Sequence, residues 1–358
     1  MKECMKAIAD LANRPSVWLD RAAEEDIIVS SRVRLARNIK DELFPQRAGV
    51  EDRVRLFGKI SQIVSGLPSM APSATLDMGD LNWTEKHVLR ERHLISVEHS
   101  EKSKGSGVVL RDDESVAIMV NEEDHLRMQA LSPGLALQAG WQKIDAVDSE
   151  LEKHVNFAFL RRIGYLTACP SNVGTGLRAS VMLHLPGLNL LNEMEQVIKG
   201  LTRIGLAVRG VLGEGTDAFG NMFQISNQMT LGETEKNIID RLTEMVLEVS
   251  GHERNARLRL IEQRKVYLMD YVGRAYGVLM NAQLLSSREM LDLLSSLRLG
   301  ADVGLIRDVS SSVIRELMLL TQPGHMQIML GRELSPEERD QMRAHMVRDK
   351  LRKMWVKT

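Results

Sequence analysis

The stretch Cys169–Pro186 constrains the fold more than any other part of the sequence. It combines a turn at Pro170–Asn172, two glycines flanking Thr175, the arginine Arg178 and the apolar run Val181–Leu183. The apolar run predicts a buried strand. Glycines let backbone N–H groups come close to an anion, and an arginine adds a planar fork of donors. The stretch therefore predicts a phosphate-handling loop without the spacing of a P-loop. A plain connecting loop with a solvated arginine is an equally weighted alternative.

Composition limits the partners and the compartment. The 358 residues suffice for two or three domains, and their net charge of −1 gives no general attraction to nucleic acid or to a membrane. Any anion binding must then come from local arginines, and we expect no direct contact with nucleic acid. Two cysteines, Cys4 and Cys169, form no disulfide framework. Because we find neither a signal peptide nor an apolar run near about 18 residues, we expect a cytoplasmic protein without a membrane span.

Alternating strand and helix patterns predict an α+β domain over residues 26–256. The pattern of Ile27–Leu35 predicts a strand in which Val33 and Leu35 face inward, while Arg32 and Arg34 share the other face as an anion clamp. An exposed polar strand face is the alternative. Further strands are expected at 108–110, 116–120, 181–183, 204–208 and 223–227, and helices at 54–64, 81–94, 150–161, 190–200 and 233–249. Such elements form an antiparallel or mixed sheet flanked by helices.

Strand patterns disappear beyond residue 257. We expect helices at 257–276, 286–300, 308–321 and 335–353. Ser286–Glu289 is a capping box, and Pro336 stands at a first helical position. The chain therefore divides into a short N-terminal segment 1–25, an α+β domain 26–256 and an all-helical C-terminal domain 257–358. Apolar faces in the helical domain make a homodimer the expected assembly.

Polar residues at loops and strand ends point to phosphoryl transfer. The arginines beside glycine or acidic residues are Arg32, Arg34, Arg127, Arg178 and Arg209. Together they can surround a triphosphate, because bidentate guanidinium groups match phosphate oxygens. Glu123 and Glu214 can grip a planar guanidinium if they meet in space, and a carboxylate must take a proton before a guanidinium nitrogen attacks. The run Asn121–Asp124 is also compatible with an acidic helix N-terminus.

Four motifs resemble those of the ATP:guanidino phosphotransferases, the arginine and creatine kinases. They are Ser30–Arg34, Asn121–Arg127, Cys169–Val181, and Arg209–Gly210 with Gly213–Glu214, in family order over about residues 25–255. The resemblance implies ATP as phosphoryl donor and Mg²⁺ held mainly through phosphates and water, so no protein metal site is expected. It also implies that Glu123 and Glu214 hold the guanidinium and act as base, and that Cys169 contacts the guanidinium. The nucleotide-binding positions it implies are Ser30, Ser31, Arg32, Val33, Arg34, His93, Arg127, Arg178, Ala179, Ser180, Val181, Met182, Arg209, Gly210, Val211, Leu212, Gly213 and Glu214.

Departures from the small-guanidine kinases point to a larger acceptor. Their helical N-terminal lid of about a hundred residues, a domain-sized block, is expected to be absent, because the first arginine motif starts at residue 30. Met119 also stands where those kinases have tryptophan. A site without a lid can admit an arginine within a polypeptide. The segment Arg339–Ala344 is similar to a motif, with Arg339, Asp340, Arg343 and Ala344, that binds phosphoarginine and regulates the bacterial protein-arginine kinases. On spacing alone, a solvated helix face is the alternative.

The resemblance implies an enzyme that transfers the γ-phosphoryl group of ATP to arginine side chains exposed on proteins. Such marking would send proteins to a Clp ATPase and protease and inactivate a stress-gene repressor, with a small zinc-binding activator protein as partner. A kinase for free arginine or another small guanidine is one alternative. A non-catalytic adaptor that sequesters the repressor is another. A cysteine-nucleophile enzyme built on Cys169 lacks histidine and acid partners in the sequence.

Overall fold

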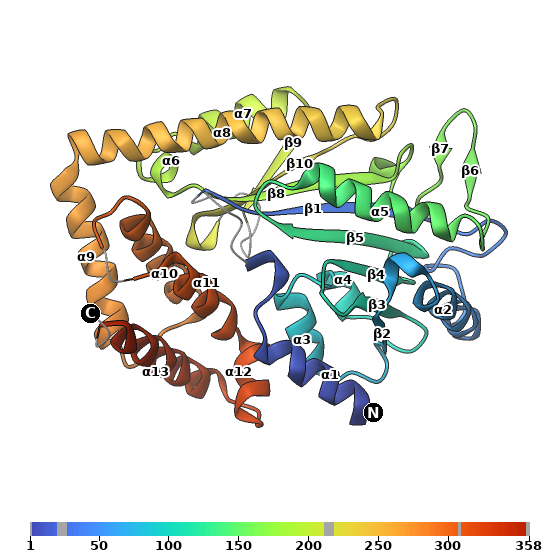
Figure 1. The fold of residues 1–358 in the computed structure, drawn as a ribbon, viewed down its shortest axis with the longest axis horizontal. Helices are drawn as coiled ribbons and strands as arrows, with labels where there is room; N and C mark the ends of the chain where they lie inside the picture. Colours follow the sequence, from blue (N-terminus) through green and yellow to red (C-terminus); the bar gives the residue numbers. More distant parts are fainter. Residues whose placement is uncertain (1, 20–26, 211–217, 307–308, 356–358) are drawn as a thin grey trace.

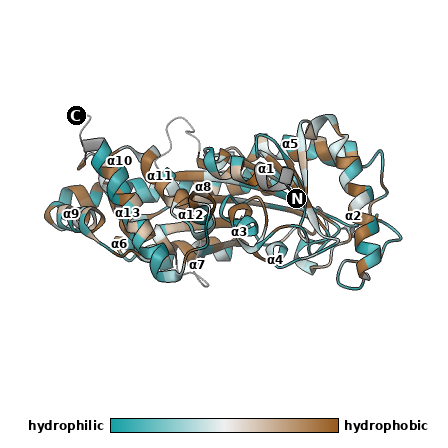
Figure 2. Ribbon diagram, turned by 90° about the horizontal axis from the view of Figure 1, so that it is seen from below, coloured by the Kyte–Doolittle hydropathy of each residue, from teal (hydrophilic) through white to brown (hydrophobic). Residues whose placement is uncertain are grey.

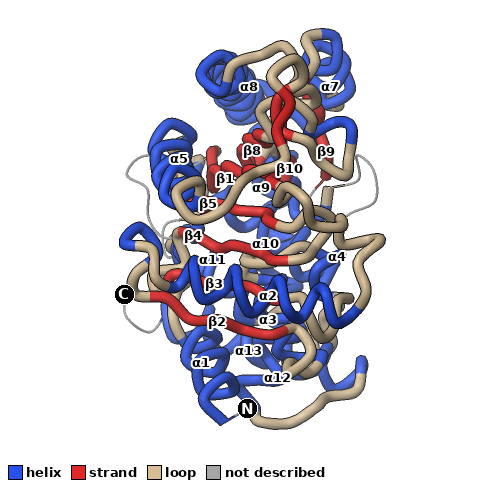
Figure 3. The backbone as a smooth tube through the Cα atoms, turned by 90° about the vertical axis from the view of Figure 1, so that its right-hand side faces the viewer, coloured by secondary structure: helices blue, strands red, loops and turns tan. Residues whose placement is uncertain are grey.

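The fold is built on an antiparallel sheet, seen in a computed structural model that describes residues 2–19, 27–210, 218–306 and 309–355. The strands are β1 Ile28–Arg37, β2 Ser73–Asp77, β3 Gly107–Arg111, β4 Val116–Val120, β5 Leu126–Pro133, β6 Phe159–Leu160, β7 Gly164–Tyr165, β8 Leu177–His184, β9 Leu206–Gly210 and β10 Met222–Asn227. In these described ranges an eight-stranded sheet has the order β2-β3-β4-β5-β1-β8-β10-β9 (Figure 3). Strands β6 and β7 pair with each other as a separate hairpin (Figure 1). Each neighbouring pair is antiparallel, which confirms the expected α+β class with an antiparallel sheet.

Helices cover both faces of this sheet and form the C-terminal region (Figure 1). They are α1 Lys2–Asn13, α2 Val50–Ser65, α3 Trp83–Glu91, α4 Val97–Ser100, α5 Leu137–Leu151, α6 Pro186–Leu190, α7 Met194–Arg203, α8 Glu235–Gln263, α9 Lys265–Asn281, α10 Ser287–Asp302, α11 Ser311–Leu320, α12 Pro323–Leu330 and α13 Pro336–Trp355. Brown and teal segments alternate along α2 in Figure 2, as expected for a helix with one buried face. None of the described helices has the length and apolar character needed to cross a bilayer.

The main hydrophobic core lies on one face of the sheet, between the strands and helices α2, α5, α7 and α8. Val33 and Leu35 of β1 are fully buried in this core, which confirms the inward-facing pair expected from the alternation. Alternate residues of a strand point to opposite faces. Arg32 and Arg34 therefore lie on the other face, which we call the arginine face.

Two smaller apolar clusters lie on the arginine face. One joins β2, β3 and β4 to α1 and α3. The other contains Trp18 of the short turn Val17–Leu19, Met182 of β8, Leu131 of β5 and Leu319 of α11. The first cluster lies on the strands beside those that carry the arginines, and the second lies farther along the arginine-bearing strands β5 and β8 themselves.

The C-terminal region is helical, as expected. Its own core joins α9, α10, α11 and α13. Ser286 caps α10 by accepting a hydrogen bond from the backbone N–H of Glu289. The region is attached to the sheet through polar contacts, since Nε2 of His184 lies 2.7 Å from Oγ of Ser295, which also accepts from Asn221 at 2.8 Å. The expected boundary between 256 and 257 lies inside α8.

Several expected elements are wrong or incomplete. The helix expected at 150–161 ends at Leu151, and Phe159 is an exposed residue of β6. The expectation rested on the i, i+4 spacing of Leu151, Val155 and Phe159. Helix α5 ends at Leu151, so the last two of these residues lie outside it. Strand β5 and helix α12 were not expected, and Gly300 lies within α10 instead of ending it.

Candidate active site

Strand register brings the arginines together on the arginine face. Arg34 of β1 pairs directly with Arg178 of β8. Arg127 of β5 pairs with Ala36, two residues from Arg34 along β1, and so lies on the same face. Arg209 of β9 pairs with Gln224, which pairs in turn with Met182 of β8. Directly paired residues share a face. Four strands therefore contribute guanidinium groups to one surface.

The electrostatics show how close these groups are. Burial, followed by the charges of Arg127 and Arg178, lowers the pKa of Arg32 to about 10. Burial and the charges of Arg32, Arg127 and Arg178 lower the pKa of Arg34 well below its usual value. Burial, followed by the charge of Arg209, lowers the pKa of Arg178. Arg32, Arg34, Arg127 and Arg178 thus lie within one group of interacting charges, and Arg209 joins it through Arg178.

Few protein groups neutralise this cluster. Nε of Arg34 and Nε of Arg178 are buried without a hydrogen-bond partner, and within the described ranges neither residue has a carboxylate partner. Arg32 donates to the neutral amide oxygen of Gln224 at 2.8 Å. Crowded, unpaired cations cost free energy that a polyanion recovers. The cluster therefore fits the phosphates of a nucleotide.

Arg127 is the arginine of this cluster that has a carboxylate partner among the described residues. Its Nη1 lies 2.5 Å from Oε1 of Glu122. Burial raises the pKa of Glu122, but the charge of Arg127 and hydrogen bonds from Arg127, Ser96 and the backbone of Glu123 lower it to about 2. Glu122 is therefore ionised at neutral pH and holds Arg127 at the edge of the cluster.

The neighbouring carboxylate, Glu123, is exposed in the turn between β4 and β5. Asn121 opens this turn with a φ of 57°, and the backbone N–H of Asn121 donates to the carbonyl of His125 at 2.9 Å. Partial burial, then the negative charge of Asp124 and of Glu122, raises the pKa of Glu123. A carboxylate that binds protons more readily than usual is suited to accept one during a reaction. The segment forms a tight turn and not an acidic helix N-terminus.

Asp124 connects this turn to the cysteine loop. Oδ1 of Asp124 accepts from the backbone N–H of Ala168 at 2.7 Å and from Nδ2 of Asn38 at 2.6 Å. Asn38 also donates to the carbonyl of Leu166 at 3.0 Å. Glu123 precedes Asp124 and Cys169 follows Ala168. The two residues are therefore next to residues that are hydrogen-bonded to each other, although they are far apart in the sequence.

Cys169 lies beside the arginine cluster. Its Sγ is 3.0 Å from Oγ of Ser171. Burial lowers the pKa of Arg178, and the interaction with Cys169 opposes this shift, which places the thiol near the Arg178 guanidinium. Gly176 has a φ of 69°, and a Cβ there would lie 2.6 Å from the carbonyl oxygen of Ala36. A glycine is therefore required where the cysteine loop enters β8. The expected loop and buried strand are confirmed.

His93 closes the arginine face on the side of α3. Burial and the charge of Arg32 lower the pKa of His93 to about 3, so its ring is neutral at neutral pH. The ring meets Trp18 edge to face with centroids 4.7 Å apart. Gln129, which pairs with Arg34 across β1 and β5, donates to the His93 carbonyl at 2.8 Å.

Other nucleotide-binding candidates divide between the two faces. Ser30, Ser180 and Met182 are on the arginine face, and Gly210 ends β9. The side chains of Val33, Ala179 and Val181 point into the main core, so only their backbone groups are available to a nucleotide. Ser31 is buried and donates to the carbonyl of Gly134. Val211, Leu212, Gly213 and Glu214 lie outside the described residues.

The residues of the C-terminal motif do not form one open face. Arg343 is 1% exposed and donates to the carbonyls of Thr321 and Leu285 and to Asp340 at 2.5 Å. Ala344 is fully buried. Arg339 is partly exposed and donates to the carbonyl of Leu334 at 3.0 Å.

Sequence reasoning missed Gln129, Gln224 and Asp124 as residues that position the site. Gln129 lies in the strand that was not expected. Gln224 is the polar residue within the strand pattern of 223–227, and its alternation was the available signal. Asp124 was part of the acidic run, but its role depends on a loop that begins more than forty residues later.

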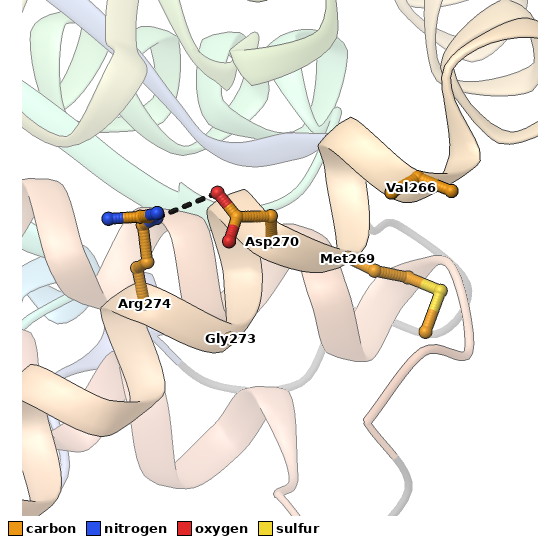
Figure 4. Close-up of a pocket in the computed structure, with 5 residues that line it drawn as sticks. All are labelled: Val266, Met269, Asp270, Gly273 and Arg274. Carbon is orange, nitrogen blue, oxygen red and sulfur yellow. Dashed lines mark hydrogen bonds and ion pairs between the residues drawn. The ribbon is translucent and has the colours of Figure 1, made fainter.

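Neither a metal cluster nor the α9 groove adds to this site. Among the described residues, no group of three or more His, Cys, Asp or Glu side chains is placed to hold a metal ion. A shallow groove on α9 is lined by Val266, Met269, Asp270, Gly273 and Arg274, with Asp270 paired to Arg274 (Figure 4). It contains none of the candidate site residues.

The raised pKa of Glu123 predicts a pH dependence. If Glu123 is the base, its ionised form is active, so the rate falls as pH decreases through its pKa, at a pH above the usual 4.5. Initial rates of phosphate transfer at saturating ATP, measured from pH 4 to 9, check this. Glu98→Gln should move the falling limb to lower pH, because the charge of Glu98 helps to raise that pKa. A reaction rate that stays the same down to pH 4.5 would contradict the prediction.

Two family models match the chain. Residues 59–256 match "ATP:guanido phosphotransferase, C-terminal catalytic domain", and residues 265–358 match "Protein-arginine kinase McsB C-terminal domain". Among solved structures, a lombricine kinase is similar with a TM-score of 0.57 and 23% identity, covering 71% of this chain and 77% of that one. A duplicated taurocyamine kinase from Schistosoma mansoni has a TM-score of 0.57 and 24% identity, covering 80% of this chain and 44% of that one. These likenesses establish the fold.

Curated relatives match nearly the whole chain. The protein-arginine kinase of Halothermothrix orenii is 43% identical over 347 residues, which cover 96% of this chain and 99% of that protein. The protein-arginine kinase of Moorella thermoacetica is 46% identical over 347 residues, covering 94% and 98%. The chain therefore belongs to the ATP:guanido phosphotransferase family and, within it, to the protein-arginine kinases.

Proposed function

We propose that this enzyme transfers the γ-phosphoryl group of ATP to the guanidinium of arginine side chains in proteins. The observation that carries the proposal is the crowding of Arg32, Arg34 and Arg178 on one face, where Nε of Arg34 and Nε of Arg178 are buried without a hydrogen-bond partner among the described residues. Glu123 and Cys169 lie at the edge of that cluster and are joined through Asp124. Glu214 is proposed as the second carboxylate from its place in the motif.

The reaction forms a bond between an arginine nitrogen and the γ-phosphorus and breaks the bond from that phosphorus to the β–γ bridging oxygen. ADP leaves with the bond electrons, and the proton of the attacking nitrogen goes to the Glu123 carboxylate. The arginine cluster compensates the charge of the transferred group, which passes through a loose transition state. His93, neutral at neutral pH, adds no further positive charge.

Mg²⁺ fits this scheme as an ion held by the phosphates. It would supply positive charge that neutralises the charge developing on the transferred group. The exposed carboxylate of Glu123 at the edge of the cluster would accept hydrogen bonds from its water ligands.

Proteins are the proposed acceptors because the similarity to protein-arginine kinases extends over almost the whole length. We propose further that the marked proteins go to a Clp ATPase and protease. In the same scheme a stress-gene repressor is inactivated and a zinc-binding protein activates the kinase in the cytoplasm. A homodimer completes the proposal. Val266 and Met269 of α9, 82% and 52% exposed, are apolar side chains available for such a contact.

The decisive experiment incubates the pure protein with γ-labelled ATP and either an unfolded protein or free arginine. We expect acid-labile label in the unfolded protein and little in free arginine. Label in free arginine alone would establish a small-guanidine kinase. No label in either, with the repressor still bound, would leave the non-catalytic adaptor as the function.

The motif at the start of α13 predicts a response to phosphoarginine. We propose that Arg339 and Arg343 bind its phosphoryl group, with Asp340 and Ala344 shaping the site. Arg339→Ala should reduce the ratio of rates with and without added phosphoarginine to about one, because a charge-assisted contact is lost. Arg332→Ala, which removes an exposed arginine just before α13, is the matched control and should keep the response. A response retained by Arg339→Ala would place the effector elsewhere.

A further inference from the structure

Helices α11 and α12 meet at a corner formed by Thr321 and Gln322. Thr321 is fully buried, and its carbonyl accepts a hydrogen bond from Nε of Arg343 at 3.1 Å. Nη1 of Arg343 also donates to the carbonyl of Leu285 at 2.6 Å. A buried carbonyl that loses its donor costs free energy, so the corner depends on where the Arg343 guanidinium points.

Helix α12, on one side of this corner, contacts α3. Glu91, at the end of α3, accepts from the backbone N–H of Gly324 at 2.8 Å and from that of His325 at 3.1 Å. One Glu91 oxygen also lies 2.7 Å from Nδ1 of His325. A Cβ at position 324 would lie 2.8 Å from the backbone nitrogen of Val88, so glycine permits this close approach of α12. Glu91 is two residues before His93.

Helix α11, on the other side of the corner, contacts Trp18. Leu319 of α11 packs in the apolar cluster of Trp18, Met182 and Leu131. The Trp18 ring meets the His93 ring edge to face, with an angle of 64° between their planes. Two contacts that start from the same corner therefore end at His93, one through the main chain after Glu91 and one through Trp18.

His93 needs such support. Its φ of 60° is in the left-handed region, which non-glycine residues adopt at a cost. Its carbonyl is held by Gln129 on the sheet, and its ring lies within the field of Arg32. A small movement of α3 or of the Trp18 side chain would therefore move the His93 ring relative to a bound nucleotide.

We propose that Glu91 and Trp18 are positioning residues for ATP, and that the corner supported by Arg343 sets their placement. The inference rests on the proposed function, with ATP as ligand and phosphoarginine as effector. A phosphoryl dianion beside Arg339 competes with Asp340 and with the Thr321 carbonyl for the Arg343 guanidinium. The corner then shifts, and α3 and Trp18 carry the shift to His93. Burial lowers the pKa of Arg343, and the charge of Glu91 partly opposes this shift, so the two groups are within electrostatic reach.

The test compares Glu91→Gln, Trp18→Ala and Trp18→Phe with the parent enzyme. Glutamine keeps one acceptor but loses the charge and presents N–H groups to the Gly324 and His325 donors. We expect Glu91→Gln and Trp18→Ala to raise KM for ATP about tenfold, with kcat at saturating ATP nearly unchanged, as for lost binding contacts. Trp18→Phe keeps an aromatic edge and should restore most of the affinity. The response to added phosphoarginine should fall with Glu91→Gln and Trp18→Ala.

The matched controls replace a tryptophan and a glutamate at exposed positions outside this network. Trp83→Ala deletes an exposed tryptophan that stacks on His87 of α3, and Glu101→Gln removes an exposed acid. Both should keep the parent KM and response. If Glu91→Gln folds poorly, His325→Leu breaks the same contact from the other side and should give the same rise in KM.

The outcomes separate this inference from the function on which it rests. Unchanged KM and response in folded Glu91→Gln and Trp18→Ala would overturn it, as would a fall in kcat without a change in KM. If the parent enzyme transfers no phosphate to any acceptor, the proposed function fails. ATP affinity from calorimetry on the same variants then still decides whether Glu91 and Trp18 position the nucleotide.

Discussion

Replacing Glu123 by glutamine lowers kcat for transfer to a protein acceptor about a thousandfold while ATP binding stays close to that of the parent, the size expected for a lost general base. The reason is geometric and electrostatic. Glu123 is exposed beside Cys169 and the arginine cluster, and its raised pKa makes it a better proton acceptor than an ordinary glutamate. Glutamine keeps the shape but accepts no proton.

Single-turnover transfer of γ-labelled phosphate and calorimetric ATP binding measure the two effects separately. Glu98→Gln is the matched control, because it removes a nearby exposed acid and should leave kcat at pH 8 within about twofold of the parent. A Glu123→Gln enzyme with parental kcat would show that the proton goes elsewhere, and Glu214 would become the first candidate.

Replacing Arg178 by lysine lowers ATP affinity about thirtyfold, within the range for lost charge-assisted hydrogen bonds. Lysine keeps the charge but not the planar fork. Nε of Arg178 is buried without a partner in the part of the chain that the structure describes, so the nucleotide is its expected acceptor. Without ATP the variant should be about as stable as the parent, because lysine places the same charge where burial and the charge of Arg209 already disfavour a cation.

Thermal unfolding with and without MgATP measures this pair of effects. The ATP-induced rise in Tm should shrink in Arg178→Lys, whereas the Tm without nucleotide should not fall. Arg203→Lys, at an exposed position that ends α7, is the matched control and should show the parental rise. Equal ATP-induced shifts in Arg178→Lys and the parent would exclude Arg178 from the nucleotide site.

The local parts of the site could be predicted because they depend on short-range patterns. The alternation of Arg32 and Arg34 with Val33 and Leu35 determines which face each side chain occupies, and the structure confirms that pair. The turn and strand after Cys169 follow from proline, glycine and an apolar run. Such signals act within a few residues of the chain.

The remaining parts depend on register and on contacts between distant segments. The sequence suggests that Arg34 and Arg178 share a site, but only strand pairing places them directly opposite each other. The spacing of Arg339 and Arg343 suggests a shared face, yet the corner at Thr321 buries Arg343. Helix α5 was assigned too late along the chain because Val155 continues its apolar spacing after the helix ends. Tertiary context, and not local preference, decides these cases.

The 29 residues of α8 have a mechanical consequence for the whole enzyme. An unbroken helix of that length is a rod of about 44 Å. Ile238 and Leu242 fix one end to the sheet core, and Leu260 fixes the other among α9 and α10 (Figure 1). Rotating the two regions against each other would break this helix. We therefore expect the short connections at the ends of the strands to adjust to substrates of different size. Among them are the turn of Asn121–Asp124 and the cysteine loop.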